Sequence, residues 1–299
     1  MFEQLLVPLD GSELAEVALP AADALAEILD AGVTLVHVIE KDAPPEIHGQ
    51  RHLSDPAEAE DYLAEVANRA FSTGTRITWH VHTAATRDVA RSIAAHVDEL
   101  GPGLIVMCTH GSSGVRDWIF GSIAQQVIGR RKAPVLLIPP SSSDPPPFAC
   151  QRLLVPLDGS TEHEQGLAVA AGLAEPCEAE IRLVCIVPTP GTLRGEETAA
   201  AMLLPMATAA ALELDEAGAQ HYLDRQVEEL EEQGLWATTE VRRGDPTQVI
   251  VEAAQEEETD IIILGTHGKA GMNAFWSESV APQVSSRTPL PLLLVPVGA

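Results

Sequence analysis

Short aliphatic runs alternate with amphipathic stretches along the chain, and this alternation predicts strands and helices in turn. The run Gln4–Asp10 is bounded by turn residues, which is typical of a strand buried on both faces. A helical pattern follows at Leu14–Leu29, and a second aliphatic run lies at Val33–Ile39. Because strand and helix keep alternating, the pattern predicts a parallel, doubly wound α/β sheet with helices on both faces.

The whole pattern occurs twice. The octapeptide LLVPLDGS is found at Leu5–Ser12 and again at Leu153–Ser160. The related segments GLIVMCTHGSSGV and DIIILGTHGKAGM occupy Gly103–Val115 and Asp260–Met272. Such similarity at a fixed offset indicates a tandem duplication, and each copy is long enough to form a domain with its own core. We call the copies the first and second repeat.

Each repeat predicts five strands in the same order. In the first repeat the remaining predicted elements are helices at Pro56–Ser72, Asp88–Leu100 and Ser122–Arg130 and strands at Arg76–Thr83, Leu104–Cys108 and Val135–Ile138. In the second repeat they are strands at Arg152–Asp158, Ile181–Val187, Ala237–Arg242, Asp260–Gly265 and Leu292–Val295 and helices at Glu162–Ala174, Ala217–Gln233, Pro246–Glu257 and Ser279–Ser286. The expected architecture is two tandem doubly wound, five-stranded parallel sheets.

A segment rich in serine and proline, SSSDPPPF, separates the repeats at Ser141–Phe148. Three prolines after serines predict a stiff, extended linker. We therefore place the first domain at residues 1–140, the linker at 141–150 and the second domain at 151–299.

The composition is strongly acidic, with 44 Asp plus Glu against 18 Lys plus Arg and a formal net charge of −26. A phosphate backbone needs a basic surface, so nucleic acid is not an expected partner. No apolar run reaches the roughly 18 residues of a membrane span, and the N-terminus lacks a signal-peptide pattern. We expect a cytoplasmic protein that does not bind membranes. The four cysteines have no metal-like spacing and are expected to be small buried residues in a reducing compartment.

The loop after the fourth predicted strand carries the richest candidate chemistry. Small residues open it. Nine residues separate the second glycine position from a third, and a serine directly after the third position begins a helix. Backbone amides and the helix dipole at such a place favour a phosphate. The alternative, that the glycines only turn the chain out of a buried strand, stays open. The pattern residues are Cys108, Gly111, Gly121 and Ser122 in the first repeat and Gly265, Gly268, Glu278 and Ser279 in the second.

Asp10 and Asp158 directly follow the first strand of each repeat. At the switch point of a doubly wound sheet, a carboxylate there is suited to bind ribose hydroxyls or a phosphate-bound metal. An aspartate in a turn that accepts from its own backbone is an equally good interpretation. Ser12 and Ser160, two residues on, are expected to cap the following helices.

The histidines divide into three groups. His110 and His267 lie in matching THG triplets without a neighbouring nucleophile, so packing or helix capping is favoured over catalysis. His37 lies within an apolar strand and is expected to be a core residue. His80 and His82 alternate along a strand and share one face, but the sequence shows no third clustered ligand, so a metal site is not the favoured interpretation.

Both repeats resemble the universal stress protein domain, and the resemblance covers nearly the whole chain. The motifs that carry it are VPLDGS after the first strand, HVIE at His37–Glu40, the THG loop and the closing APVLLIP. The family's ATP-binding members carry GxxG, nine residues, and then GS or GT. The resemblance implies a Rossmann-like, adenine-nucleotide-hydrolase-like fold with ATP and its Mg as ligands.

The resemblance also implies which residues bind the nucleotide. Adenine would lie against Pro8, Val38 and Met107, and Asp10 would bind the ribose or the nucleotide-bound Mg. Gly111, Gly121, Ser122 and Ile123 would line the phosphates. The matching set in the second repeat is Pro156, Asp158, Ile186, Leu264, Gly265, Gly268, Ser279 and Val280.

The repeats are expected to pair as an intramolecular pseudo-dimer, with Val135–Ile138 antiparallel to Leu292–Val295; a further homodimer stays open. Both depart from the family pattern. Cys108 replaces the first glycine, which costs little at negative φ. Glu278 replaces the third, and a carboxylate about 5 Å from a phosphate charge costs about 3 kcal/mol at an effective dielectric near 20. We therefore expect the first repeat to bind ATP and the second to be mainly structural.

Three functions follow. The leading one is an ATP-binding stress-response protein. Binding of the nucleotide would alter the shape of the protein or its interaction with a protein partner that the sequence does not identify. The alternative is an interaction or scaffold protein that retains the fold without nucleotide. The third, an enzyme of the related ATP-pyrophosphatase superfamily, is disfavoured because its serine-glycine-rich loop after the first strand is absent. No catalytic residue set is evident, so slow ATP hydrolysis is the most activity expected.

Overall fold

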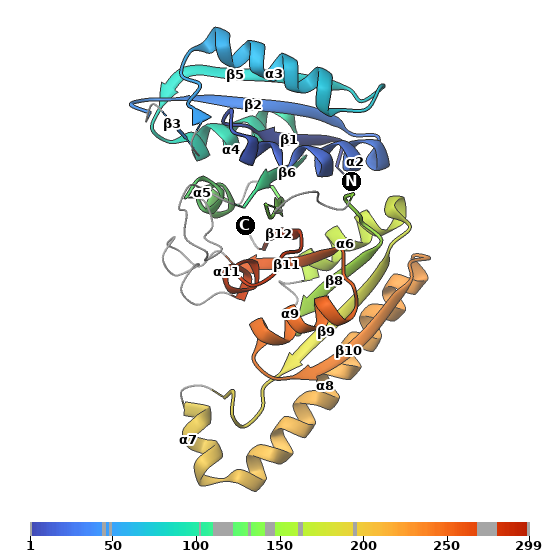
Figure 1. The fold of residues 1–299 in the computed structure, drawn as a ribbon. Coiled ribbons are helices and arrows are strands. Elements are labelled where there is room, and N and C mark those ends of the chain that lie inside the picture. Colours follow the sequence, from blue (N-terminus) through green and yellow to red (C-terminus); the bar gives the residue numbers. More distant parts are fainter. Residues whose placement is uncertain are drawn as a thin grey trace. The chain divides into compact units, whose positions relative to one another are not determined.

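The computed structural model describes residues 2–43, 46–47, 50–101, 103–109, 122–130, 133–140, 147–160, 164–193, 196–267 and 280–297. It divides into two compact units. Unit 1 holds residues 1–148, 267–277 and 289–296, and unit 2 holds 149–266, 278–288 and 297–299. Strands and helices alternate along both units (Figure 1), which confirms the predicted α/β class.

Unit 1 contains one mostly parallel sheet in the order β12-β7-β6-β1-β2-β5, and a separate hairpin, β3-β4. Its strands are β1 Gln4–Pro8, β2 Gly32–Glu40, β3 Glu46–Ile47, β4 Gln50–Arg51, β5 Ile77–Thr86, β6 Gly103–Cys108, β7 Val135–Ile138 and β12 Leu292–Val297, the last residue of which falls in unit 2. Its helices are α1 Glu13–Glu16, α2 Leu19–Leu29, α3 Pro56–Ala70, α4 Val89–Leu100 and α5 Ser122–Arg130.

The expected antiparallel pairing of the two closing strands is confirmed. β12 pairs with β7 so that Leu292 faces Leu137 and Leu294 faces Val135. The pairs β6·β7, β1·β6, β1·β2 and β2·β5 are all parallel. The last strand of the second repeat therefore extends the sheet of unit 1.

Helices cover both faces of the sheet in unit 1. α2 contacts α3, and α4 contacts α5. The chain moves outward from β1 to β2 and β5, then returns to the other side of β1 at β6. Because the crossovers are right-handed, this reversal places α2 and α3 on one face and α4 and α5 on the other. Leu5, Leu35, Leu63, Ile93 and Leu104 are fully buried between these layers.

The helix expected at Leu14–Leu29 is broken into α1 and α2, which corrects the prediction. Pro20 lies in the first turn of α2 and has no amide hydrogen, so it cannot continue the hydrogen-bond ladder from α1. The expected cap at Ser12 is confirmed, because its hydroxyl oxygen accepts from the Ala15 amide at 3.1 Å. Apolar periodicity continues across the break, which is why the pattern missed it.

Unit 2 has parallel strands in the order β10-β9-β8-β11. Its elements are β8 Arg152–Leu157, α6 Glu164–Cys177, β9 Glu180–Val187, α7 Glu196–Leu203, α8 Pro205–Glu232, β10 Ala237–Arg243, α9 Pro246–Glu256, α11 Val280–Ser285 and β11 Ile261–His267, the last residue of which falls in unit 1. Ser160 donates its amide to Asp158 Oδ1 at 2.9 Å, and α6 begins four residues later. None of the described helices combines the length and apolar character that a bilayer crossing needs.

The helix expected at Ala217–Gln233 is longer than predicted. It begins at Pro205, whose fixed φ suits the first helical turn, and it follows the shorter α7. Its later half packs on β9 and β10 and buries Leu223, Gln226 and Leu230. The corner between α7 and α8 lies beyond the strands (Figure 1). It exposes the large apolar side chains Met202, Leu203, Leu204, Met206 and Leu214.

One polar interaction is repeated in both halves of the chain. Tyr62 on α3 donates to Glu16 Oε1 at 2.9 Å, and Tyr222 on α8 donates to Glu164 Oε1 at 3.2 Å. The two glutamates occupy equivalent positions after the repeated octapeptide, and the chain has only these two tyrosines. Each tyrosine therefore ties the helix of the variable stretch to the first helix of its repeat.

This pair of interactions predicts a loss of stability in alkali. Burial, with the nearby glutamate carboxylate, raises the pKa of both tyrosines. An unfolded tyrosine ionises near pH 10. Because the folded pKa is higher, the unfolded state loses its protons first, so this stability is complete below about pH 10 and falls above it. We expect the urea-unfolding free energy to fall less steeply with pH in Y62F/Y222F than in the wild type. The same pH dependence of the unfolding free energy in the variant and in the wild type would contradict this role of the two tyrosines.

Candidate functional site

The predicted adenine-binding residues of the first repeat come together at one edge of the sheet. β6, β1 and β2 are neighbours and parallel, so their carboxyl ends meet at the same edge. Pro8 ends β1, Met107 is the penultimate residue of β6, and Val38 lies two residues before the end of β2. Met107 and Val38 are each 7% exposed, and Pro8 is half-buried. The order reverses between β1 and β6, which makes this edge the topological switch point.

Asp10 shapes the turn that follows β1. Its Oδ1 accepts from the Ser12 amide at 2.9 Å and from the Ser12 hydroxyl at 2.6 Å. Ser12 in turn caps α1, so the carboxylate orders the start of that helix. The structure therefore bears out the turn interpretation for one carboxylate oxygen. The role of Asp10 toward ribose or Mg stays a prediction.

The segment Gln50–Leu53, which we call the covering segment, packs over this turn. Gln50 Oε1 accepts from the Glu13 amide at 2.7 Å and so satisfies a free donor at the start of α1. A Cβ added to Gly11, which has φ +90°, would lie 2.7 Å from Leu53 Cδ1. The turn therefore requires glycine at position 11 for two reasons: its φ is positive, and Leu53 occupies the space that a side chain would fill.

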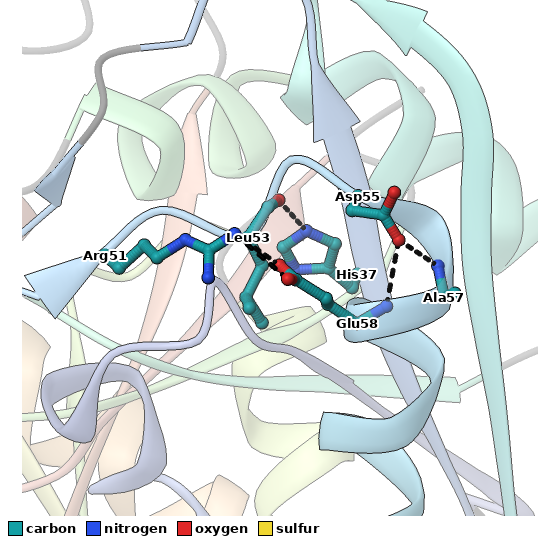
Figure 2. Close-up of polar contacts among 6 residues, drawn as sticks. All are labelled: His37, Arg51, Leu53, Asp55, Ala57 and Glu58. Carbon is teal, nitrogen blue, oxygen red and sulfur yellow. Dashed lines mark hydrogen bonds and ion pairs between the residues drawn. The ribbon is translucent and has the colours of Figure 1, made fainter.

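His37 fastens the covering segment to the sheet. It is 1% exposed, which confirms the expectation of a core residue. Its Nδ1 lies 2.8 Å from the Leu9 carbonyl oxygen. Its Nε2 lies 2.9 Å from the Leu53 carbonyl oxygen, a contact drawn in Figure 2. A carbonyl oxygen only accepts, so the hydrogen bond to either carbonyl uses a ring N–H, and the tautomer of the ring determines which nitrogen donates. The imidazole thus joins the loop after β1 to the segment before α3, a role that the sequence did not indicate.

Two further contacts hold the covering segment in place. Asp55 Oδ1 caps α3 by accepting from the amides of Ala57 and Glu58 at 2.8 and 3.1 Å. The Arg51 guanidinium donates to both carboxylate oxygens of Glu58 at 2.9 and 3.0 Å (Figure 2). The Arg51–Glu58 pair is exposed and contributes little to stability, whereas the cap is worth about 1 kcal/mol.

The second repeat has a different environment at the matching edge. Pro156, Ile186, Leu264 and Gly265 lie near the carboxyl ends of β8, β9 and β11, which are again neighbours. Cys185 stands where the first repeat has His37, and burial, with the nearby Asp158 carboxylate, raises the pKa of its thiol. Gly159 has φ +79° but open space beside it. The described part of this repeat therefore has no counterpart of Leu53 over the turn.

Helix α6 approaches the end of β11 closely. A Cβ added to Gly166 on α6 would lie 3.2 Å from the Gly265 amide nitrogen. Glycine at both positions lets the helix and strand backbones come together, and Gly265 is half-buried there. The contact between α6 and the end of β11 is therefore tightly packed. Val280, the last predicted contact, is half-buried at the start of α11.

Most of the predicted phosphate loop lies outside the described residues. These are Gly111, Gly121, Gly268 and Ser279, together with His110 and Glu278. Ser122 is exposed and Ile123 half-buried at the start of α5, where the helix dipole favours an anion. Arg130, at the other end of α5, donates to both oxygens of Asp88, the cap of α4, at 2.5 and 2.7 Å. It therefore joins two helices.

The contrast between the two turns predicts different costs for the same substitution. Gly11→Ala and Gly159→Ala both place a side chain at positive φ, which costs about 1–2 kcal/mol. Only Gly11→Ala must also displace Leu53, and overpacking adds typically 1–3 kcal/mol. We expect urea unfolding to show a clearly larger loss for Gly11→Ala than for its matched control, Gly159→Ala. Equal losses would mean that Leu53 moves aside freely.

Comparison with known proteins gives a consistent result. A family model described as the universal stress protein family matches residues 1–139 and 150–296. Universal stress protein E homolog of Haemophilus influenzae is 25% identical over 285 residues, which cover 90% of this chain and 84% of that protein. Universal stress protein Sll1654 of Synechocystis sp. is 30% identical over 145 residues, which cover 46% of this chain and 87% of that protein.

The fold has a full-length counterpart among solved structures. A universal stress protein from Archaeoglobus fulgidus matches with a TM-score of 0.71 and 18% identity, covering 99% of this chain and 96% of that one. Two α/β repeats in tandem are thus found in both chains. At this identity the match establishes the fold.

Proposed function

Because the chain belongs to the universal stress protein family, whose role is in stress response, we propose that its first repeat binds ATP in the cytoplasm. Occupancy of that site would change the shape of the protein or its affinity for a protein partner. One observation carries the proposal: Pro8, Val38 and Met107 meet at the carboxyl edge of β6, β1 and β2, at the switch point of the sheet. Ligands of doubly wound sheets bind at such edges.

The described residues fit an adenine nucleotide with its Mg. Val38 and Met107 offer an apolar surface to the base, beside the half-buried ring of Pro8. Asp10 is ordered at the end of β1, where a carboxylate would bind ribose hydroxyls or the nucleotide-bound Mg. Ser122 adds a hydroxyl donor at the start of α5, where phosphate is favoured. Gly111 and Gly121 would complete the phosphate loop.

The two repeats should differ in affinity. In the first, the covering segment and His37 hold the turn after β1 in one conformation, so less ordering is required when a ligand binds. In the second, Cys185 replaces that histidine, and Glu278 stands where the first repeat has Gly121. A carboxylate near the phosphates opposes their charge and is itself favoured at a helix start. We therefore propose one nucleotide per chain, bound by the first repeat.

The proposal does not include fast catalysis. Asp10 is engaged in its turn and His37 contacts two carbonyl groups, so neither is placed as a general base. At most we expect slow hydrolysis of bound ATP. The competing function is a scaffold or interaction protein that keeps the fold without nucleotide, and the exposed apolar corner between α7 and α8 favours that reading.

Exchange of the residues at the third glycine position of the two repeats, Gly121 and Glu278, tests the proposal. We expect calorimetry with Mg-ATP to give one site in the wild type and native mass spectrometry to show one bound nucleotide. Gly121→Glu should weaken that site roughly a hundredfold, because it adds a carboxylate beside the phosphates. Glu278→Gly should leave the first site intact and add a second.

Two outcomes would contradict this scheme. Absence of ATP binding in every variant, with folding verified by circular dichroism, would favour the scaffold function. Two sites in the wild type would show that Glu278 does not exclude the phosphates, and the repeats would then not differ in ATP binding as proposed.

A further inference from the structure

Three imidazoles meet on the outer strand of unit 1. His80 and His82 lie on β5, two residues apart, and His96 lies on α4. The ring centroids of His80 and His96 are 4.7 Å apart, and those of His82 and His96 are 5.7 Å apart. One ligand nitrogen from each of the three rings lies within 4.8 Å of the others. The sequence shows only the pair on β5, because the third ring arrives through the packing of α4.

Alternation along β5 explains why the rings share a face. The Trp79 indole donates to Glu60 Oε1 on α3 at 2.8 Å, so this side chain lies on the α3 side of the sheet. His80 and His82 flank the buried Val81 and point to the opposite face. α4 packs against β2 and β5 there and brings His96 to them. The cluster is thus built on two regular elements.

His96 has the features of a metal ligand that is already oriented. It is 7% exposed, and its Nδ1 lies 3.0 Å from Glu99 Oε2 one turn along α4. A carboxylate accepts, so Nδ1 carries the hydrogen and Nε2 presents a lone pair. That buried Nε2 has no hydrogen-bond partner among the residues that the structure describes. Metal-binding histidines commonly use this arrangement, with the second nitrogen donating to a carboxylate.

We propose that His80, His82 and His96 bind a divalent transition-metal ion of the zinc class. Imidazole is a good ligand for zinc and its neighbours, whereas Mg and Ca prefer oxygen. Two nitrogens on one tetrahedral zinc lie roughly 3.3 Å apart, since each Zn–N bond is about 2.0–2.1 Å. The exposed His80 and half-buried His82 are free to close the remaining distance while His96 stays in place. Solvent beside His80 would supply the fourth ligand.

The site does not depend on the nucleotide proposal. Its three ligands come from β5 and α4, and none of them belongs to the predicted ATP contacts. The net charge of −26 attracts cations to the surface in general. The test must therefore separate three-imidazole binding from diffuse attraction by carboxylates. Excess Mg serves that purpose, because it competes for oxygen ligands but not for imidazole.

The experiment is a calorimetric titration of ZnCl₂ into the metal-free, tag-free full chain with Mg in excess. We expect one saturable site per chain. His80→Ala should remove it without loss of folding, because this side chain is exposed. Glu99→Gln should keep the three ligands but weaken zinc binding by about 10–100-fold. The matched control His221→Ala, on an exposed position of α8, should bind as the wild type does.

A second readout identifies the coordination. Co²⁺ loaded in place of zinc should show the intense visible absorption of a four-coordinate site, and His82→Ala should abolish it. The proposal is overturned if zinc does not saturate a site, or if His80→Ala and His82→Ala bind as tightly as the wild type. It is also overturned if Glu99→Gln has no effect while His96→Gln folds and binds normally.

A separate contact in unit 2 carries an independent inference. Cys150, just before β8, and Cys177, the last residue of α6, have their Sγ atoms 2.7 Å apart. Cys150 is buried and Cys177 is half-buried. The hydrogen bond with Cys150 lowers the pKa of Cys177, which raises its thiolate fraction. The cysteines were expected to be small buried residues in a reducing compartment, and their spacing does not indicate this pair.

We infer that peroxide joins Cys150 and Cys177 in a disulfide. The Cys177 thiolate attacks peroxide and the O–O bond breaks; the departing hydroxide takes up the proton that the thiol had released, which gives a sulfenic acid and water. The Cys150 thiol then attacks the sulfenic sulfur, the S–O bond breaks, and the thiol proton leaves with the hydroxyl group as a second water, so two thiols are oxidised and one peroxide is reduced. We expect mass spectrometry to show loss of two hydrogen atoms in the wild type and in Cys108→Ser/Cys185→Ser. Cys177→Ser should not lose them. The same loss in Cys177→Ser, or no loss in the wild type, would overturn the inference.

Discussion

Burial of the parallel strands on both faces is the constraint on which the rest of the molecule depends. Strands such as β1 and β8 are aliphatic and buried at their centres, Leu5–Val7 and Leu153–Val155, so neither face is suited to contact with water there. Helices must therefore cover both sides, and every connection must leave the sheet at a strand end. This requirement brings the ends of β6, β1 and β2 to one edge, where polar and small residues are free to serve a ligand.

The duplication separates structural features from functional ones. The tyrosine–glutamate interaction occurs in both repeats, at equivalent glutamates, although the tyrosines lie on unlike helices. A contact kept under such different surroundings fits a structural role. The covering segment, with its Gln50 and Leu53 contacts, occurs over the turn of the first repeat, and open space adjoins Gly159 in the described part of the second. A feature present in one copy is the better candidate for a specific function.

The two buried histidines, His37 and His96, differ in how their ring nitrogens are satisfied, because a polar atom in the low-dielectric interior needs a hydrogen-bond partner. His37 is tolerated in the core because its ring nitrogens lie within hydrogen-bond distance of the Leu9 and Leu53 carbonyl oxygens. His96 is buried with Nδ1 close to Glu99, whereas its Nε2 has no hydrogen-bond partner among the described residues. One histidine thus contacts the backbone of two loops, while another retains an unsatisfied atom. Only the second arrangement indicates an exogenous ligand.

By itself the sequence determined the α/β class, the duplication, and the strands whose ends form the candidate site, because strand burial leaves a local, periodic record. It also predicted the antiparallel pairing of β7 with β12 through family resemblance. The break before Pro20 was not predicted, since apolar spacing continues through it. The early start of α8 was missed because its first part is alanine-rich and mostly exposed, with no buried stripe to indicate a helix. Tertiary structure alone decided that Leu53 covers Gly11 and that His96 joins His80. Those contacts connect residues far apart in the chain, and their partners follow from how helices pack on the sheet rather than from any local pattern.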